Sequence, residues 1–356
     1  MALEIKELKI PYCERVVHGR DKTTGLDAFI CVYSTKLGPA LGGIRAWQYA
    51  LPYAARKDSI LLAKAMTYKN SLAGINYGGG KGVINLKGVE KTKDLLKSFG
   101  ELVQFLGGKF IAGKDVGITI HDLRVIAQTS EYVAHVNPNI HSVDPSPPTA
   151  LGIVRGMEAS INTLRDGMAP GRNLEGVHVV IQGLGAVGSR LASMLKKKKV
   201  QLTVTDTNKE VLAKAVAKFG AKAVKQPNKI YDVECDIFAP CALGSIINED
   251  TIERFKCKII CGSANNQLED KLAGYAMLVK NILYAPDYLV NAGGVTNSAA
   301  ELSDSYDEFE VASSIDYIYD RLIQVYEISH KEHLPTNMVA ARLAEERLDK
   351  GKVNGK

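Results

Sequence analysis

The sequence has no apolar run that approaches the length needed to cross a membrane, and no signal-peptide core follows its start, which is charged from Glu4 onward. Its six cysteines, at positions 13, 31, 235, 241, 257 and 261, do not show the paired spacing of a disulfide framework. Reduced thiols in a cytoplasm fit this cysteine usage best. We therefore expect a cytoplasmic protein that does not act at a membrane.

Histidine is scarce, with seven residues in 356, and offers no metal site. The two closest, His330 and His333, stand at the charged end of a predicted helix without a third ligand nearby, which favours an exposed helix face. The net charge of +6 is small for this length, which argues against a nucleic-acid partner and agrees with a small anionic substrate. With 46% hydrophobic and 24% charged residues, the chain is long enough for two globular domains.

Two lysines twelve residues apart, Lys69 and Lys81, stand out in the first half, and Lys81 directly follows the glycines at 78–80. Three glycines allow the backbone to turn sharply and let a small ligand approach the main chain. Two ammonium groups at one pocket would attract a carboxylate, and each would lower the pKa of the other toward that of a base. The alternative is a pair of solvated surface lysines beside a glycine turn.

Strand and helix patterns alternate around this pair. Residues 27–33 predict a strand, and the glycine-rich segment 38–45 predicts a turn that forms a ligand loop. A short strand is predicted at 83–86 and an amphipathic helix at 93–106. The segment 54–66 predicts a helix that ends near Lys69 and has a buried apolar stripe at positions 60, 61, 62, 65 and 66.

A further acid, Asp115, ends the predicted strand that begins at Phe110. Its carboxylate could exchange a proton with Lys81 if the fold brings the two together. The alternative is an Asp that caps a helix over 119–126. The polar segment 137–149 then carries prolines at 138, 145, 147 and 148, which predicts an interdomain hinge.

The second half contains a dinucleotide-binding fingerprint in its proper context. A strand over 176–182 runs into Gly183-Leu-Gly185-Ala-Val-Gly188, and a helical pattern follows. The first glycine suits the tight turn, the second the approach of a pyrophosphate, and the third the packing of helix on strand. A second strand ends in Asp206, where an acid would bind a ribose 2′-hydroxyl and repel a 2′-phosphate. Because no Arg follows it, we predict NAD rather than NADP.

Three more predicted strands, at 236–239, 258–262 and 282–285, complete a doubly wound sheet. Small polar residues follow them, at the strand ends where open α/β sheets bind ligands. We predict an α/β fold with two domains separated by a cleft. The predicted parts are a substrate-binding and catalytic domain over 1–143, a Rossmann NAD-binding domain over 144–330, and a C-terminal helix over 331–356 that packs back toward the first domain.

Taken together, these motifs resemble the glutamate/leucine/phenylalanine/valine family of amino-acid dehydrogenases, and within it the leucine dehydrogenase branch most. The resemblance covers nearly the whole chain. It depends on the segments GPALGGIR (38–45), MTYKNSLAGINYGGGK (66–81), GKDVG (113–117), GLGAVG (183–188), TDTNKE (205–210), CDIFAPCALG (235–244), GSANNQL (262–268) and YAPDYLVNAGG (284–294).

The resemblance implies reversible NAD-dependent oxidative deamination of an L-amino acid by a homo-oligomer. It implies that Lys69 holds the substrate carboxylate, that Lys81 is the catalytic base and that Asp115 relays protons. The expected substrate-binding residues are Lys69, Leu41, Gly42, Gly43, Gly113, Asn266, Val295 and Ser298. The expected cofactor-binding residues are Thr149, Gly183, Gly185, Ala186, Val187, Gly188, Asp206, Thr207, Cys241, Ala242, Ala264, Asn265 and Asn291.

Four positions bear on the substrate side chain. Leu41 stands where glutamate-type members carry Lys, so the pocket should be apolar, and Val295 is leucine-like. Gly113 is the phenylalanine-type choice, and Ser298 replaces a usual aliphatic residue. Lys114 replaces a usual Glu, for which we have no account. We predict leucine, valine or isoleucine as substrate, with phenylalanine or tryptophan as the alternative, and a catalytically silent NAD-binding sensor as an alternative of another class.

Overall fold

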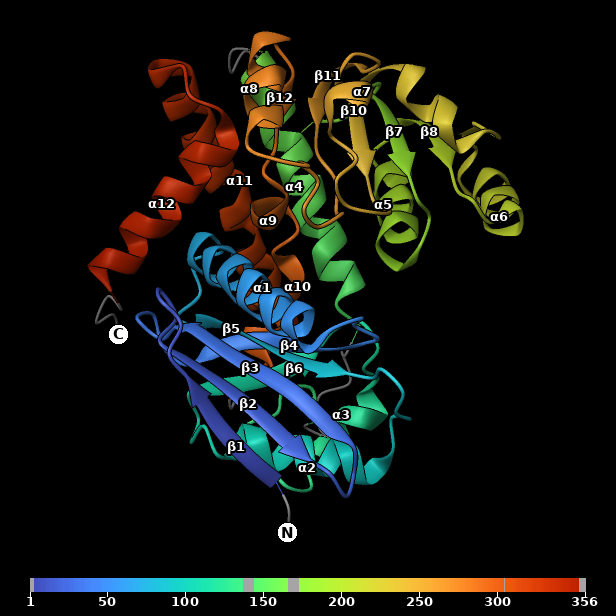
Figure 1. The fold of residues 1–356 in the computed structure, drawn as a ribbon. Coiled ribbons are helices and arrows are strands. Elements are labelled where there is room, and N and C mark those ends of the chain that lie inside the picture. The colour runs from blue at the N-terminus through green and yellow to red at the C-terminus, as the bar shows by residue number, and fades with distance from the viewer. Residues whose placement is uncertain (1–2, 137–143, 166–172, 304, 352–356) are drawn as a thin grey trace. The chain divides into compact units, whose positions relative to one another are not determined.

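The structure is a computed structural model that describes residues 3–136, 144–165, 173–303 and 305–351. It divides into two units, each with its own six-stranded sheet, which confirms the predicted two-domain α/β fold. The first unit consists of Met1–Val143, Ser298–Tyr306 and Ala344–Lys356, and the second of Asp144–Asn297 and Asp307–Leu343. The first unit therefore combines segments that are distant in the sequence, as the colours of Figure 1 show, whereas only residues 298–306 interrupt the second.

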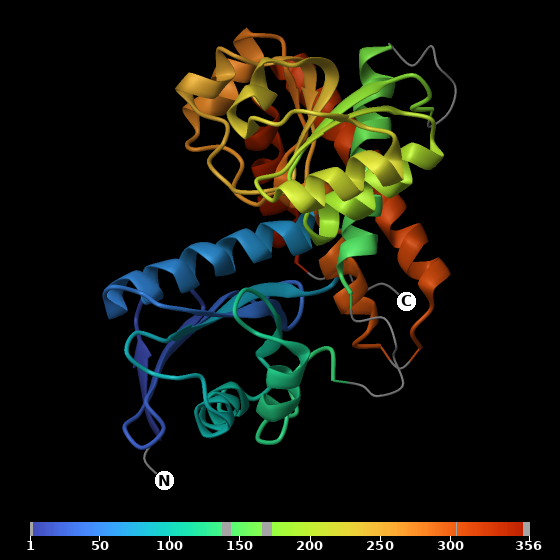
Figure 2. The ribbon, with the colours of Figure 1, turned by 90° about the vertical axis from the view of Figure 1, so that its right-hand side faces the viewer.

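The first unit is a mixed sheet covered by helices on both faces. Its elements are β1 (Leu3–Leu8), β2 (Arg15–Asp21), β3 (Leu26–Ser34), β4 (Ala40–Trp47), α1 (Pro52–Leu72), β5 (Gly78–Asn85), α2 (Lys93–Gln104), β6 (Phe110–Lys114) and α3 (Ile120–Ile126). The strand order is β1-β2-β3-β5-β4-β6, and β4 runs parallel to both of its neighbours. Figures 1 and 2 show α1 on one face of the sheet and α2 and α3 on the other.

The prediction that both glycine-rich segments of the first half are turns is wrong. Residues 40–47 form strand β4, and the glycines at 78–80 begin strand β5. The reason is close packing: a Cβ on Gly79 would lie 2.1 Å from the backbone nitrogen of Thr67 in α1, and one on Gly80 would lie 2.7 Å from the Phe110 ring. Glycine is required here because the α1 backbone and the Phe110 ring of β6 approach the β5 backbone more closely than any side chain allows.

The predicted buried stripe on α1 is also wrong. Leu61, which belonged to that stripe, is 56% exposed. The buried face instead carries small and polar residues at about one-turn spacing, which let the helix lie directly on the glycines of β5. These residues are Ala55, Ser59, Ala63, Thr67 and Asn70. By contrast, the predicted apolar face of α2 is confirmed, because Leu95, Leu96, Phe99, Leu102 and Val103 are all buried.

The second unit is a parallel sheet with strand order β12-β11-β10-β7-β8-β9, as predicted for a doubly wound fold. Its strands are β7 (His178–Gln182), β8 (Gln201–Thr205), β9 (Lys222–Ala223), β10 (Glu234–Pro240), β11 (Lys256–Ile260) and β12 (Leu283–Tyr284). Its helices are α4 (Ser146–Leu164), α5 (Ala186–Lys197), α6 (Lys209–Phe219), η1 (Pro227–Asp232), α7 (Glu249–Ile252), α8 (Leu272–Val279), α9 (Asp287–Val290) and α11 (Glu308–Glu332). Two helices have residues in both units, namely α10 (Gly293–Ala300) and α12 (Thr336–Lys350).

The predicted proline hinge falls partly outside the described residues, which exclude 137–143. Asp144 and Pro145 are not helical, but the segment is helical from Ser146, where α4 begins, and Pro147 and Pro148 lie in the first turn of this helix. Proline is tolerated there since the first backbone N–H groups of a helix have no partner within it.

The end of α12 belongs to the first unit and is fastened to the end of α1. The Ser71 hydroxyl donates to the Ala344 carbonyl at 2.8 Å. The Arg347 guanidinium donates to the carbonyls of Ser71 at 2.9 Å, Gly74 at 3.0 Å and Ile75 at 2.9 Å. A residue from the last turns of the chain thus caps the helix that carries Lys69.

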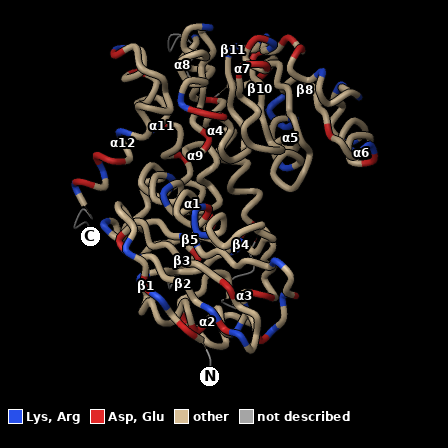
Figure 3. Tube along the Cα trace, viewed as in Figure 1, with Lys and Arg blue, Asp and Glu red and all other residues tan. Residues whose placement is uncertain are grey.

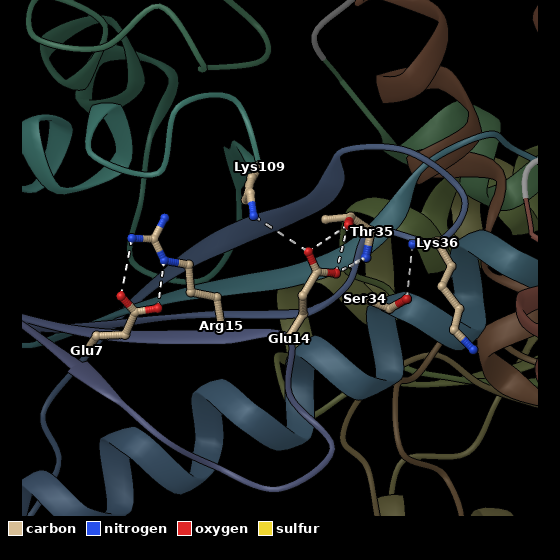
Figure 4. A network of polar contacts seen from close by, with 7 residues as sticks. All are labelled: Glu7, Glu14, Arg15, Ser34, Thr35, Lys36 and Lys109. Carbon is tan, nitrogen blue, oxygen red and sulfur yellow. Dashed lines mark hydrogen bonds and ion pairs between the residues drawn. The ribbon is translucent and has the colours of Figure 1, made fainter.

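Polar contacts also hold the outer strands of the first unit together (Figure 4). Arg15 donates to Glu7 at 3.0 Å between β2 and β1, and the Glu14 carboxylate accepts from the Thr35 backbone at 2.7 Å. Acidic and basic residues both occur along α2 and α12, so neither helix carries a charge of one sign (Figure 3). Among the described residues, no helix is long and apolar enough to cross a membrane.

Candidate active site

Lys81 and Asp115 form an ion pair at the centre of the first unit. Lys81 lies in β5 and is 5% exposed, and its Nζ atom is 2.7 Å from Oδ2 of Asp115, directly after β6. Lys81 is therefore not a solvated surface residue. Asp115 does not cap α3 either, since the capping box of that helix consists of Thr119 and Asp122. The structure brings together the two residues that the sequence predicted as base and proton relay.

Three further residues extend this pair into a polar network that the sequence analysis missed. Arg45 of β4 donates from Nε to Asp115 and from Nη1 to Asp58 of α1, at 3.2 Å in both cases. The Tyr49 hydroxyl donates to the same Asp58 carboxylate. Side chains two apart in a strand share a face, so Arg45 lies on the face of Gly43. A strand prediction for residues 40–47 would therefore have placed Arg45 beside the candidate site.

Burial and charge set the ionisation of the pair. Burial lowers the pKa of Lys81 below its ordinary value, because it outweighs the opposing effect of the Asp115 carboxylate, and the Arg45 charge lowers this pKa further. Burial alone would raise the pKa of Asp115, but the Lys81 and Arg45 cations outweigh it and hold this pKa below its usual range. The result is an amine that is easier to deprotonate than an exposed lysine, beside a carboxylate that stays ionised.

The predicted substrate-binding glycines lie in two of these strands, β4 and β6. Gly43 of β4 pairs with Gly113 of β6, and a Cβ on Gly43 would lie 2.7 Å from the Asp115 Cβ. The glycine therefore leaves the room that the Asp115 side chain occupies. Leu41 and Gly42 precede it in β4 and are buried.

Lys69 is half-buried in the last turn of α1. Its neighbour Asn70 ties this turn to two strands, since its side-chain amide donates to the carbonyls of Gly78 at 2.6 Å and Leu41 at 3.2 Å. The end of α1 is thereby held against the strands that carry Leu41 and Lys81.

In the second unit the fingerprint has the geometry that a dinucleotide requires. Gly183 has φ +97°, and a Cβ there would lie 2.8 Å from that of Ala242. A Cβ on Gly188 would lie 2.0 Å from the Gly183 carbonyl oxygen, so this glycine allows α5 to pack on β7. A Cβ on Gly185 would meet nothing within 4 Å, which leaves an open surface at the start of α5, at Ala186 and Val187. The chain therefore fits a bound pyrophosphate at this helix N-terminus.

The loops that follow the parallel strands carry the remaining predicted residues. Asp206, after β8, accepts from the Leu184 backbone at 2.8 Å, so it supports the fingerprint turn, and Thr207 next to it is exposed. The Cys241 and Ala264 nitrogens bond to the Gln182 and Pro240 carbonyls of the adjacent strands, at 2.8 and 2.9 Å.

Three amides of the second unit are in fixed positions. The Asn291 amide donates to the Asn265 side chain at 2.9 Å, and the Asn266 backbone donates to Asp287 at 2.6 Å. Thr149 donates its hydroxyl hydrogen to the Pro145 carbonyl at 2.7 Å in the first turn of α4.

Val295 is in the part of α10 that belongs to the second unit, whereas Ser298 is in the first unit. Among the described residues, no cluster of His, Cys, Asp or Glu could hold a metal ion.

The family to which a chain with a buried Lys–Asp pair and a dinucleotide fingerprint belongs follows from two family models. The model of the Glu/Leu/Phe/Val dehydrogenase dimerisation domain matches residues 12–135. The model of the Glutamate/Leucine/Phenylalanine/Valine dehydrogenase family matches residues 199–352. The chain belongs to the Glu/Leu/Phe/Val dehydrogenase family.

Several relatives match this family member along nearly its whole length. The leucine dehydrogenase of Thermoactinomyces intermedius is 45% identical over 338 residues, which cover 94% of this chain and 91% of its own. The crystal structure of L-tryptophan dehydrogenase from Nostoc punctiforme has a TM-score of 0.83 at 40% identity and covers 95% of this chain and 96% of its own. A hetero-hexameric glutamate dehydrogenase from Thermus thermophilus shares the fold, with a TM-score of 0.73 at 22% identity, covering 98% of this chain and 88% of its own.

This Glu/Leu/Phe/Val dehydrogenase is thus an amino-acid dehydrogenase, an oxidoreductase that acts on the CH–NH₂ group of its substrate. Enzymes of the family use a nicotinamide dinucleotide. Its first unit supplies the buried lysine and carboxylate, and its second unit supplies the dinucleotide fingerprint.

Proposed function

We propose that this enzyme catalyses the reversible NAD-dependent oxidative deamination of a branched aliphatic L-amino acid, with leucine, valine and isoleucine as substrates. The observation that carries the proposal is the buried Lys81 amine, 2.7 Å from Asp115. A lysine with a lowered pKa beside an ionised carboxylate can accept a proton and return it, as a general base must.

Each residue has a distinct task in this proposal. Lys69 holds the substrate carboxylate, and Lys81 takes a proton from the water that attacks the imine carbon. Asp115 passes protons to and from Lys81 and stabilises its ammonium form. NAD, which the fingerprint glycines and Asp206 would hold, would supply the acceptor for the hydride of Cα. Loss of this hydride and of a proton from the amine oxidises the amino acid by two electrons to the imine, and hydrolysis of the imine, which is redox-neutral, releases the 2-oxo acid and ammonium.

The preference for NAD rests on Asp206. Its carboxylate stands at the end of β8, where it suits the two hydroxyls of an unphosphorylated ribose and repels a 2′-phosphate. The adjacent Thr207 and Asn208 bring no positive charge to offset that repulsion.

The preference for an aliphatic side chain rests on Leu41 and Val295. Both are apolar, and neither can pair with a substrate carboxylate or amide. Aromatic substrates are the second candidate, favoured by the small residues Gly113 and Ser298 and by the likeness to the L-tryptophan dehydrogenase. We further propose that the enzyme is a cytoplasmic homo-oligomer, for which the match of residues 12–135 to a dimerisation domain is the support.

A screen for NADH formation at 340 nm over the twenty L-amino acids, with NAD and with NADP, tests the proposal. We expect leucine, valine and isoleucine with NAD to give the highest kcat/KM. The matched control is Lys81→Met, which keeps the length and apolar stem of the side chain but cannot take a proton. If none of the twenty amino acids supported NADH formation, the result would contradict the proposal and favour a silent NAD-binding sensor.

A further inference from the structure

A buried His–Glu pair lies beside the predicted side-chain end of the substrate site. The His135 and Glu301 side chains are 8% and 3% exposed, and Nδ1 of His135 is 2.5 Å from Oε2 of Glu301. Two polar groups withdrawn from water are costly unless they bond to each other. The contact between Nδ1 and the Glu301 carboxyl group fixes the orientation of the ring.

The opposite edge of this imidazole meets the two residues at which the pocket differs from the leucine-type pattern. Nε2 of His135 is 3.4 Å from Oγ of Ser298. A Cβ added to Gly113 would lie 3.5 Å from Nε2 and 3.8 Å from Cδ2 of the ring. The imidazole therefore lies within van der Waals reach of the space that the small residues at 113 and 298 leave.

His135 has a backbone conformation that is unfavourable for a residue with a side chain. Its φ is +64°, a left-handed conformation that favours glycine and that a non-glycine residue adopts only where its surroundings impose it. The surroundings do so in this case, because the Ala134 nitrogen donates to the Ala112 carbonyl at 2.8 Å and the Ala112 nitrogen donates to Tyr132 at 3.0 Å. These bonds fix the segment against β6, one residue before Gly113.

We propose that His135, oriented by Glu301, is a specificity-determining residue that closes the side-chain end of the substrate pocket. The ring takes up the room that Gly113 and Ser298 release, so the pocket remains short enough to prefer a branched aliphatic side chain over an aromatic one. This inference rests on the proposed function, since it concerns the same site. It resolves the conflict between Leu41, which indicates an aliphatic substrate, and Gly113, which indicates an aromatic one.

The test is the ratio of kcat/KM for phenylalanine to that for leucine in wild type and in His135→Gly. Glycine removes the ring and suits the left-handed backbone, so the pocket should lengthen without strain. We expect the ratio to rise by about tenfold or more, the effect of added volume in an apolar pocket. His333→Gly is the matched control, because His333 is also left-handed, with φ +53°, but exposed at the end of α11. It should leave the ratio unchanged.

A second variant keeps the test decisive if His135→Gly does not fold. His135→Asn retains a residue that tolerates the left-handed region and removes most of the ring, so the ratio should rise by an intermediate amount. A folded variant whose ratio stays within about twofold of wild type would overturn the inference, as would a wild type that prefers phenylalanine by about tenfold. A wild-type enzyme that fails to reduce NAD with any of the amino acids would instead contradict the proposed function. That result would be known before either variant is made.

Discussion

Lys81 lies in the interior of a strand with its ammonium group withdrawn from water, an environment that favours the neutral amine. If it is the base, Lys81→Ala should lower kcat for deamination by about 10²-fold or more, the usual range for general-base catalysis. The affinity for NADH should change little, since the dinucleotide residues belong to the other unit. Steady-state kinetics together with an NADH titration measure both. A variant that retains more than about half of the wild-type kcat would contradict the role of base.

The charges around Lys81 predict two pH shifts of opposite sign. Deamination requires the neutral amine, so kcat should rise with pH through the pKa of Lys81. Arg45 lowers this pKa and Asp58 raises it. Arg45→Met should therefore move the rise in kcat to higher pH, and Asp58→Asn should move it to lower pH. The kcat–pH profiles of both variants and wild type give the measurement, and shifts in the same direction would show that Lys81 does not control the profile.

At the scale of elements, the role of a glycine could be inferred from the sequence where the contact that requires it lies within one short segment of chain. The fingerprint glycines 183 and 188 are needed for a left-handed turn and for the contact of α5 with the preceding turn, and both requirements lie within one strand-turn-helix unit. The glycines of β4 and β5 were misjudged because their requirement is not local. Gly79 is small because Thr67 of α1 lies against it, and Gly80 because Phe110 does. The first contact requires knowing which face of α1 lies on β5, and the second requires knowing that β6 packs near β5.

The same distinction applies to the candidate site. From the residues alone, Asp115 could be a partner of Lys81 or the cap of a helix, and the roles of base and proton relay came from the family resemblance. The roles of Arg45 and His135 could not be inferred from the sequence. The contact of Arg45 with Asp115 depends on β4 lying next to β6, and that of His135 with Ser298 depends on a segment distant in the chain. Residues that act through neighbours distant in the sequence become recognisable only with the fold.

The loop after β8 predicts how cofactor choice can be changed. Asp206→Ser combined with Thr207→Arg should improve kcat/KM for NADP relative to NAD, because a repulsion is removed and a phosphate partner is added. Position 207 is preferable to 208, since the Asn208 side chain accepts from Glu210 and Val211 as the N-cap of α6. Asn208→Arg in place of Thr207→Arg is the control and should cost about 1 kcal/mol of stability. A wild type that used both cofactors equally would show that Asp206 does not select between them.

At the scale of the whole molecule, neither unit is a continuous stretch of chain. The first unit takes residues 298–306 and 344–356 from the last quarter of the sequence, and these supply Ser298 and Glu301 next to His135 and Arg347 at the end of α1. The substrate side of the site is thus completed by segments that follow the dinucleotide fold in the chain. If Lys69 holds the substrate carboxylate, as proposed, the end of α12 would support substrate binding as well as the fold, because it contacts the end of α1.

Arg347 makes this testable. Its guanidinium caps the carbonyl groups at the end of α1, where Lys69 and Asn70 lie, and a hydrogen bond from a charged donor contributes about 1.5–3 kcal/mol. Without that cap the last turn of α1 should fray, so Lys69 would hold the substrate carboxylate less firmly. Arg347→Met should therefore raise KM for the amino acid and lower Tm, and leave KM for NAD unchanged.

The matched control on the same helix is Arg342→Met, which removes an exposed ion pair with Glu332 and should change Tm and both KM values little. Thermal unfolding and steady-state kinetics on the two variants separate the outcomes. A fall in Tm of Arg347→Met with no change in KM for the amino acid would mean that the end of α1 supports the fold but does not position Lys69. An equal rise in KM for the amino acid in both variants would assign the effect to α12 as a whole rather than to the cap.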